Sequence, residues 1–205
     1  MNKAALAEPI CVANRTVLEV SNVKPGDLVV IQGAGAIGIL CMLMAKISGA
    51  GTIIMTGTGI DKHRLEIARQ LGAHHTINIQ EENPLELIRS LGDGYGADLV
   101  VDCTGVSAAL QQAMEFIRPL GTITKVGWGP QPMNFSLDPL VAKAARIQAS
   151  FSHTYGTWER TLTLISSGLL DLEPILGGVY PIEDWKTAFE QMECGNHIKS
   201  VIRIK

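Results

Sequence analysis

The stretch LVVIQGAGAIGILCMLMAK, residues 28–46, runs eighteen positions without a charge and holds glycines at 33, 35 and 38. About 18 uncharged apolar residues is the lower limit for a helix that spans a membrane. Here a Pro-Gly-Asp turn precedes the stretch, LVVI is short and β-branched, and the glycines interrupt the run. The stretch therefore predicts a buried strand, a tight turn, and a helix over 36–47 that ends near Gly49.

The same alternation of strand and helix continues along the chain. Strands are expected at 52–56, 75–78, 98–103, 122–127 and 146–151. Helical patterns separate most of them, and in the first of these Leu65, Ala68 and Leu71 share a face. This alternation is typical of a parallel sheet covered by helices on both faces. Helix patterns at 157–168 and 182–195 and a strand at 199–205 look like an appendage continuous with the sheet domain.

Composition limits the partners and the compartment. The chain has 205 residues, of which 46% are hydrophobic, enough for one substantial core, and its formal net charge is −3. Its 17 lysines and arginines are scattered, which argues against nucleic acid as a partner. The four cysteines form no C-x-x-C pair, and the N-terminus lacks the apolar core of a signal peptide. We expect a cytoplasmic protein without nucleic-acid or membrane partners.

The spacing G-x-G-x-x-G gives the opening stretch a chemical role. After a first strand, Gly33 permits a tight turn, Gly35 lets a pyrophosphate approach the backbone, and Gly38 allows close packing of helix on strand. The start of the helix, at Ala36 and Ile37, then offers free N–H groups and a partial positive charge to the phosphates. Because strand and helix flank the motif and more alternating units follow, the sequence predicts a dinucleotide-binding site.

The end of the second strand bears on which dinucleotide binds. An Asp or Glu about 20 residues after the motif usually holds the adenine-ribose hydroxyls of NAD, but Gly57 stands there. Gly57 leaves room for a 2′-phosphate, which hydroxyls and cations nearby could bind. In the alternative, Asp61 swings back to the ribose from a longer loop. The sequence favours NADP over NAD, with these further candidate residues: Thr56, Thr58, Lys62 and Arg64.

Five segments, EPICVA, VKPGDLVVIQGAGAIGILCMLMAKISGA, RLEIARQLGA, ADLVVDCTG and HIKSVIRIK, resemble the zinc-dependent medium-chain alcohol dehydrogenases. The resemblance is to the coenzyme-binding part of the threonine and sorbitol dehydrogenase branch and covers essentially the whole chain. It implies a Rossmann sheet of order 3-2-1-4-5-6 and a homodimer formed through a sheet edge near residues 131–139. It also implies that these residues lie near the cofactor, the last two at its nicotinamide end: Cys103, Thr104, Gly105, Val126 and Gly127.

Family members carry, ahead of this part, a catalytic domain that supplies Cys and His ligands to a catalytic zinc. We therefore expect residues 1–205 to be one NAD(P)-binding Rossmann domain whose short N- and C-terminal segments pack on a catalytic domain that this chain lacks. By resemblance, Glu8 stands where the family has a further acidic zinc ligand. Glu8 alone cannot hold zinc. His153 is a possible cleft residue, although a surface histidine with its hydrogen bonds satisfied is the commoner case.

Two hypotheses of different classes remain. In the first, the chain is the cofactor-binding portion of an alcohol, polyol or threonine-type dehydrogenase, and is catalytically incomplete alone. In the second, it is a free-standing dinucleotide-binding module or regulatory subunit. Other classes lack their motifs: no Tyr is followed by Lys four residues later, and no nucleophile elbow or Walker loop occurs. A methyltransferase would usually have the acidic residue that Gly57 replaces.

Overall fold

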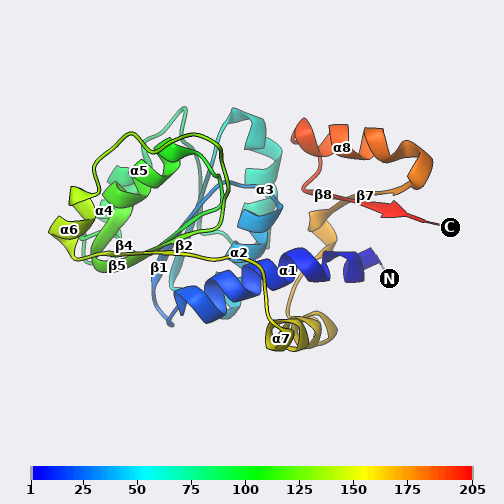
Figure 1. Cartoon of the computed structure of the whole chain (residues 1–205), viewed down its shortest axis with the longest axis horizontal. Helices are drawn as coiled ribbons and strands as arrows, with labels where there is room; N and C mark the ends of the chain where they lie inside the picture. Colours follow the sequence, from blue (N-terminus) through cyan, green and yellow to red (C-terminus); the bar gives the residue numbers. More distant parts are fainter. Residues whose placement is uncertain (1, 205) are drawn as a thin grey trace.

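The main layer of the molecule is a parallel sheet (Figure 1), which has six strands in the order β3-β2-β1-β4-β5-β6. The computed structural model describes residues 2–204. The expected Rossmann sheet and its strand order are confirmed. The strands are β1 (Leu28–Gln32), β2 (Thr52–Gly57), β3 (His75–Asn78), β4 (Ala97–Asp102), β5 (Ile117–Lys125) and β6 (Arg146–Ala149).

Helices cover both faces of the sheet because side chains along each strand alternate in direction. Val29 and Ile31 belong to one core, which they share with α2 (Ala36–Ile47) and α3 (Lys62–Leu71). Val30 belongs to the opposite core, with α4 (Pro84–Ser90), α5 (Ser107–Phe116) and α6 (Asp138–Lys143). All five residues of β1 are buried, which explains why this strand is apolar on both faces.

Most elements lie within a few residues of the positions expected from the sequence. Helix α2 begins and ends where expected, whereas β5 begins earlier, at Ile117. The first helix, α1 (Ala7–Asn14), was not expected. Pro9 lies in its first turn, where a missing N–H breaks no helical hydrogen bond. In the part of the chain that the structure describes, no helix combines the length and apolar character needed to cross a membrane.

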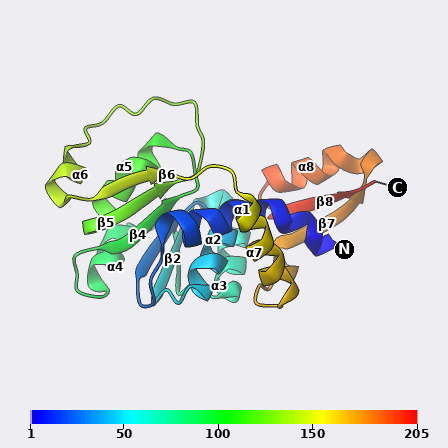
Figure 2. The same cartoon turned by 60° about the horizontal axis from the view of Figure 1, so that its bottom comes forward.

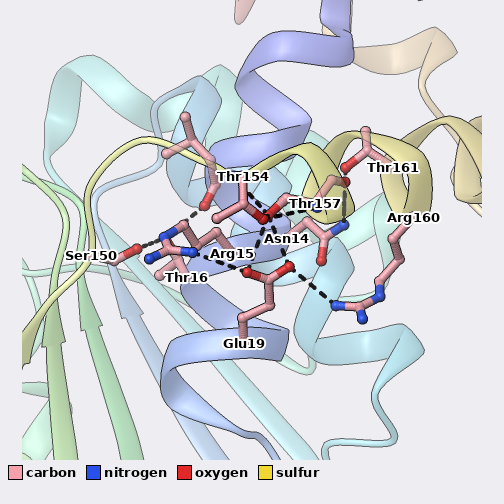
Figure 3. A network of polar contacts seen from close by, with 10 residues as sticks. Asn14, Arg15, Thr16, Glu19, Ser150, Thr154, Thr157, Arg160 and Thr161 are labelled. Atoms are coloured by element: carbon pink, nitrogen blue, oxygen red, sulfur yellow. Dashed lines mark hydrogen bonds and ion pairs between the residues drawn. The ribbon is translucent and has the colours of Figure 1, made fainter.

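A network of polar side chains fixes the N-terminal helices to α7 (Tyr155–Ser166) (Figure 3). Asn14, which is buried, donates from Nδ2 to Thr161 Oγ1 at 2.9 Å. Thr157 donates from Oγ1 to Glu19 Oε1, also at 2.9 Å, from the π-helical turn η2 (Arg15–Ser21). Since buried polar groups need partners, this network holds α1, η2 and α7 in one arrangement. Its other labelled members are Arg15, Thr16, Ser150, Thr154 and Arg160.

The C-terminal part carries a second, smaller sheet, and its Ile175 and Ile198 belong to the same core as α2 (Figure 2). There β7 (Leu176–Pro181) and β8 (Lys199–Arg203) make a separate two-stranded parallel sheet, which α8 (Trp185–Glu193) contacts. The expected last strand is confirmed, and it pairs with β7 rather than with a strand of the main sheet. Strand β7 was not expected from the sequence, and Gly177 is needed in it because a Cβ there would collide with His197.

Candidate functional site

The turn between β1 and α2 carries the three motif glycines, and each meets a different requirement. Gly33 has a φ of +97°, in the left-handed region that favours glycine. A Cβ on Gly38 would overlap the carbonyl oxygen of Gly33, so the helix can approach the turn only with glycine here. A Cβ on Gly35 would meet no atom within 4 Å. The backbone at Gly35 therefore faces open space, into which a ligand can come close.

Helix α2 begins at the edge of this open space. Gly35 is its N-cap residue, and no side chain caps the helix. The N–H groups of the first turn, including those of Ala36 and Ile37, have no acceptor within the helix, whose first such bond runs from Ile39 to Gly35. With the helix dipole, these free donors make an end that binds anions. The start of α2 thus fits a pyrophosphate group.

A cavity of about 350 Å³ lies beside this turn, where β1, β2 and β4 end. Ligands of open parallel sheets bind at this edge. Part of its wall, from Ile79, Val106 and Ala109, was not expected from the sequence. Ile79 follows β3, and Val106 and Ala109 lie at the start of α5. These positions at strand and helix ends are the signal that could have identified them as wall residues. The wall also contains these residues predicted to bind the cofactor: Gly33, Gly35, Thr56, Gly57, Thr58, Cys103 and Thr104.

The carboxylate of Asp61 lies over Gly57 and lines this cavity. A Cβ on Gly57 would stand 3.0 Å from the Cβ of Asp61. Oδ2 of Asp61 accepts hydrogen bonds from the backbone N–H and the Oγ1 of Thr58, both at 3.0 Å, and Oδ1 accepts from Arg64 Nη1 at 3.2 Å. The acidic group absent from the end of β2 is thus supplied by the short 3-10 turn η3 (Gly59–Asp61).

The two cations that the sequence offered to a 2′-phosphate do not line the cavity. Arg64 donates to Asp61 and also to the backbone carbonyls of Met192 and His197 in the C-terminal part. Lys62 and Glu66 line a separate hollow between α3 and the end of β3. This arrangement supports the alternative in which Asp61 reaches the ribose.

The loops that follow β4 and β5 contact each other next to the cavity. A Cβ on Gly127 would overlap the backbone nitrogen of Gly105, and a Cβ on Gly105 would overlap the carbonyl oxygen of Trp128. Val126 packs, partly buried, against the core that contains α2. These three predicted residues, Gly105, Val126 and Gly127, do not line the cavity itself. The contacts of Gly105 and Gly127 explain why glycine is needed at those two positions, and the place of Val126 and Gly127 at the nicotinamide end stays a prediction.

Cys103 stands between the motif turn and these loops and has a thiol neighbour, Cys41. A hydrogen bond to Cys41 raises the pKa of the Cys103 thiol well above its ordinary value, and burial of the thiol is the second largest cause. The thiol therefore stays protonated at neutral pH, whereas metal ligation and nucleophilic attack need the thiolate. Cys103 acts here as part of the cavity wall.

The described residues do not fit a zinc ion by themselves. Within residues 2–204, no group of three or more His, Cys, Asp or Glu side chains is placed to hold a metal. Glu8 is exposed in the first turn of α1. His153 packs edge-on against Trp158, with ring centroids 5.2 Å apart, and does not line the cavity.

Known proteins with similar sequences and structures agree with this geometry. Residues 36–167 match the family model described as zinc-binding dehydrogenase. The sorbitol dehydrogenase of Halalkalibacterium halodurans is 33% identical over 200 residues, which cover 97% of this chain and 58% of that protein. A probable D-xylulose reductase A of Emericella nidulans is 33% identical over 204 residues, covering 98% and 56%.

Solved structures give the same result. The alcohol dehydrogenase TADH from Thermus sp. ATN1 matches with a TM-score of 0.91 at 29% identity, over 100% of this chain and 59% of that one. The chain thus spans less than two thirds of the length of the relatives it matches.

The different surroundings of the glycines predict different effects of substitution. Gly35→Val should fold with a loss of roughly 1 kcal/mol in unfolding free energy, because its Cβ meets open space but valine is a poorer N-cap residue than glycine, and it should lose dinucleotide binding. Gly38→Ala should cost roughly 1–3 kcal/mol, because its Cβ overlaps Gly33. Urea denaturation and titration with NADH, followed by nicotinamide fluorescence, measure the two effects. Full NADH affinity in Gly35→Val would contradict the assignment of the open space to phosphate.

Proposed function

The chain belongs to the zinc-binding dehydrogenase family, and we propose that it is the coenzyme-binding part of an enzyme that transfers a hydride between a secondary alcohol, such as a polyol, and a nicotinamide dinucleotide. The observation that carries this proposal is the open backbone at Gly35, directly before the uncapped start of α2. A phosphate pair needs both features: backbone that can be approached closely and free N–H groups.

The chain's own residues bind and orient the cofactor. The pyrophosphate lies on the N–H groups at Ala36 and Ile37, and the adenosine occupies the cavity against Ile79 and Val106, whose apolar side chains suit a purine ring. The nicotinamide extends toward the loops that hold Gly105 and Gly127. When bound, the nicotinamide ring supplies the hydride acceptor or donor of the reaction.

Activation of the alcohol needs groups beyond those described here, because residues 2–204 contain no metal-holding cluster. In this proposal, residues 1–205 are a single Rossmann domain that packs on a catalytic domain through its N- and C-terminal segments. Exposed aromatic side chains on α8 support this: Trp185 and Phe189 are 53% and 51% exposed and lie edge to face. Side chains of this kind are typical of surfaces that a partner covers.

We also propose a cytoplasmic protein whose partners are the dinucleotide and a small alcohol. All four cysteines are free thiols, which fits a reducing compartment.

For the cofactor we propose a preference for NAD, in contrast to the NADP that the sequence alone favoured. The support is the carboxylate of Asp61, which can accept hydrogen bonds from ribose hydroxyls and repels a 2′-phosphate. Arg64 is already bonded to that carboxylate and to two backbone carbonyls.

Asp61→Asn should weaken NADH binding about tenfold or more, because a charge-assisted hydrogen bond contributes roughly 1.5–3 kcal/mol. NADPH binding should be unchanged or stronger, because the repulsion of its 2′-phosphate is gone. Fluorescence titration of both nucleotides measures the two affinities, and Glu66→Gln, which removes a carboxylate that does not line the cavity, is the control. A wild-type chain that prefers NADPH would contradict this choice of cofactor.

A homodimer is proposed through strand β6, the sheet edge that follows residues 131–139. The strand is the last in the sheet order, and three of its four residues are exposed. An edge strand of this kind needs protection or a partner. Light scattering at micromolar concentration should show a dimer, and Ile147→Lys should shift it toward monomer. Leu162→Lys, on the exposed side of α7, serves as the control. A monomeric wild-type chain would count against the dimer.

The 205-residue chain should bind nucleotide but oxidise no alcohol. Polarising a hydroxyl with zinc takes several ligands and one open position, and among the described residues only Glu8 is a candidate ligand. Metal analysis should find much less than one zinc per chain, and a panel of polyols, alcohols and threonine should give no NADH. Stoichiometric zinc with turnover would overturn this expectation. Nucleotide binding by the same sample distinguishes an incomplete enzyme from an inactive preparation, and the metal-loaded relatives are the positive controls for the activity assay.

A further inference from the structure

One buried carboxylate at the cofactor edge has no part in the function proposed above. Asp102 is the last residue of β4, and none of its surface is exposed. A buried charge of this kind is costly unless it is paired and fully hydrogen-bonded. Its partners therefore show what its burial achieves.

The two carboxylate oxygens of Asp102 bind two different loops. Oδ1 accepts from the backbone N–H of Thr104 at 2.9 Å and from its Oγ1 at 2.7 Å, in the loop after β4. Oδ2 accepts from Nζ of Lys125 at 3.0 Å, at the end of β5. The main-chain carbonyl of Asp102 accepts from the N–H groups of Val126 and Gly127, both at 2.9 Å.

The loops after β4 and β5 pack so closely that neither can move without displacing the other. The glycine contacts described above bring Gly105 against Gly127 and Trp128, and a Cβ on Gly129 would overlap the carbonyl oxygen of Gly105. Thr104 in turn lies next to the motif turn, because a Cβ on Gly33 would stand 3.0 Å from Thr104 Cγ2. A shift of either loop would therefore disturb the other and the turn that faces the phosphates.

We propose that Asp102 is a positioning residue for the reaction: its carboxylate ties the loops after β4 and β5 together and so fixes the bed on which the nicotinamide lies. This inference rests on the proposed function, which places the nicotinamide between these loops. Asp102 touches neither substrate nor cofactor in this role, since it acts through Thr104 and Lys125.

Asparagine at position 102 separates the two connections. The amide oxygen can still accept from Thr104, so the loop beside the cavity keeps its bonds. The amide nitrogen, however, would face the ammonium of Lys125, and two donors cannot bond to each other. Lys125 is 31% exposed and can turn to water. Asp102→Asn should therefore loosen the loop after β5 more than the adenosine cavity.

The test compares two ligands on the full chain: NADH, and ADP-ribose, which has no nicotinamide. Asp102→Asn should weaken NADH about tenfold while ADP-ribose affinity stays within about twofold. Lys125→Arg, which keeps the cation, should retain NADH affinity. Asp98→Asn is the matched control, because it removes a carboxylate that is paired with Arg118 at the opposite end of β4. Calorimetry measures both ligands, and bound NADH fluorescence reports the nicotinamide surroundings.

A second variant keeps the test decisive if Asp102→Asn fails to fold. Asp102→Asn with Lys125→Met leaves no unpaired charge and should show the same selective loss of NADH affinity. Equal losses for NADH and ADP-ribose, unchanged NADH affinity, or unfolding of both variants would overturn the positioning role. A wild-type chain that binds neither ligand would instead contradict the proposed function.

Discussion

The close approach of Gly38 to the carbonyl of Gly33 is the contact on which the site depends. It lets α2 start directly at the end of β1, so that the free N–H groups of its first turn point at the edge of the sheet. A larger residue at 38 would push the helix away and tilt those donors. The position of α2 in turn sets one side of the cavity. The wall from α5 and the loops after β4 and β5 lie next to the same turn.

The fold is predictable from the sequence where a local pattern determines the structure. The apolar run of β1 and the glycine spacing after it predict a strand, a turn and a helix to within a few residues. Contacts with the rest of the chain do not change these elements. The alternation of later strands with helices is equally local, and it leads to a parallel sheet. The expected wall residues Thr56, Gly57 and Cys103 follow from the rule that ligands lie beyond the strand ends.

Features that depend on contacts with distant elements were not predictable from the sequence. The position of Asp61 over Gly57 depends on the path of a short 3-10 turn, which residue counting does not reveal. Arg64, expected to be free, is held by carbonyls more than a hundred residues away. Strand β7 was not predicted, and its Gly177 is required by the side chain of His197, which lies against it. In each case the deciding atom comes from another element, so no spacing in the sequence encodes it.

The network between the N-terminal helices and α7 has a consequence for how the chain acquires its structure during synthesis. Asn14 and Thr161 are separated by 147 positions, and Thr16 and Ser150 by 134. The apolar side of α1 can dock on α2 early, but its buried polar side chains wait for partners that leave the ribosome more than 130 positions later. Contacts so distant in sequence form slowly. Helix α1 is thus made before the sheet but locked late, and chains interrupted before residue 150 would expose it to chaperones and proteases.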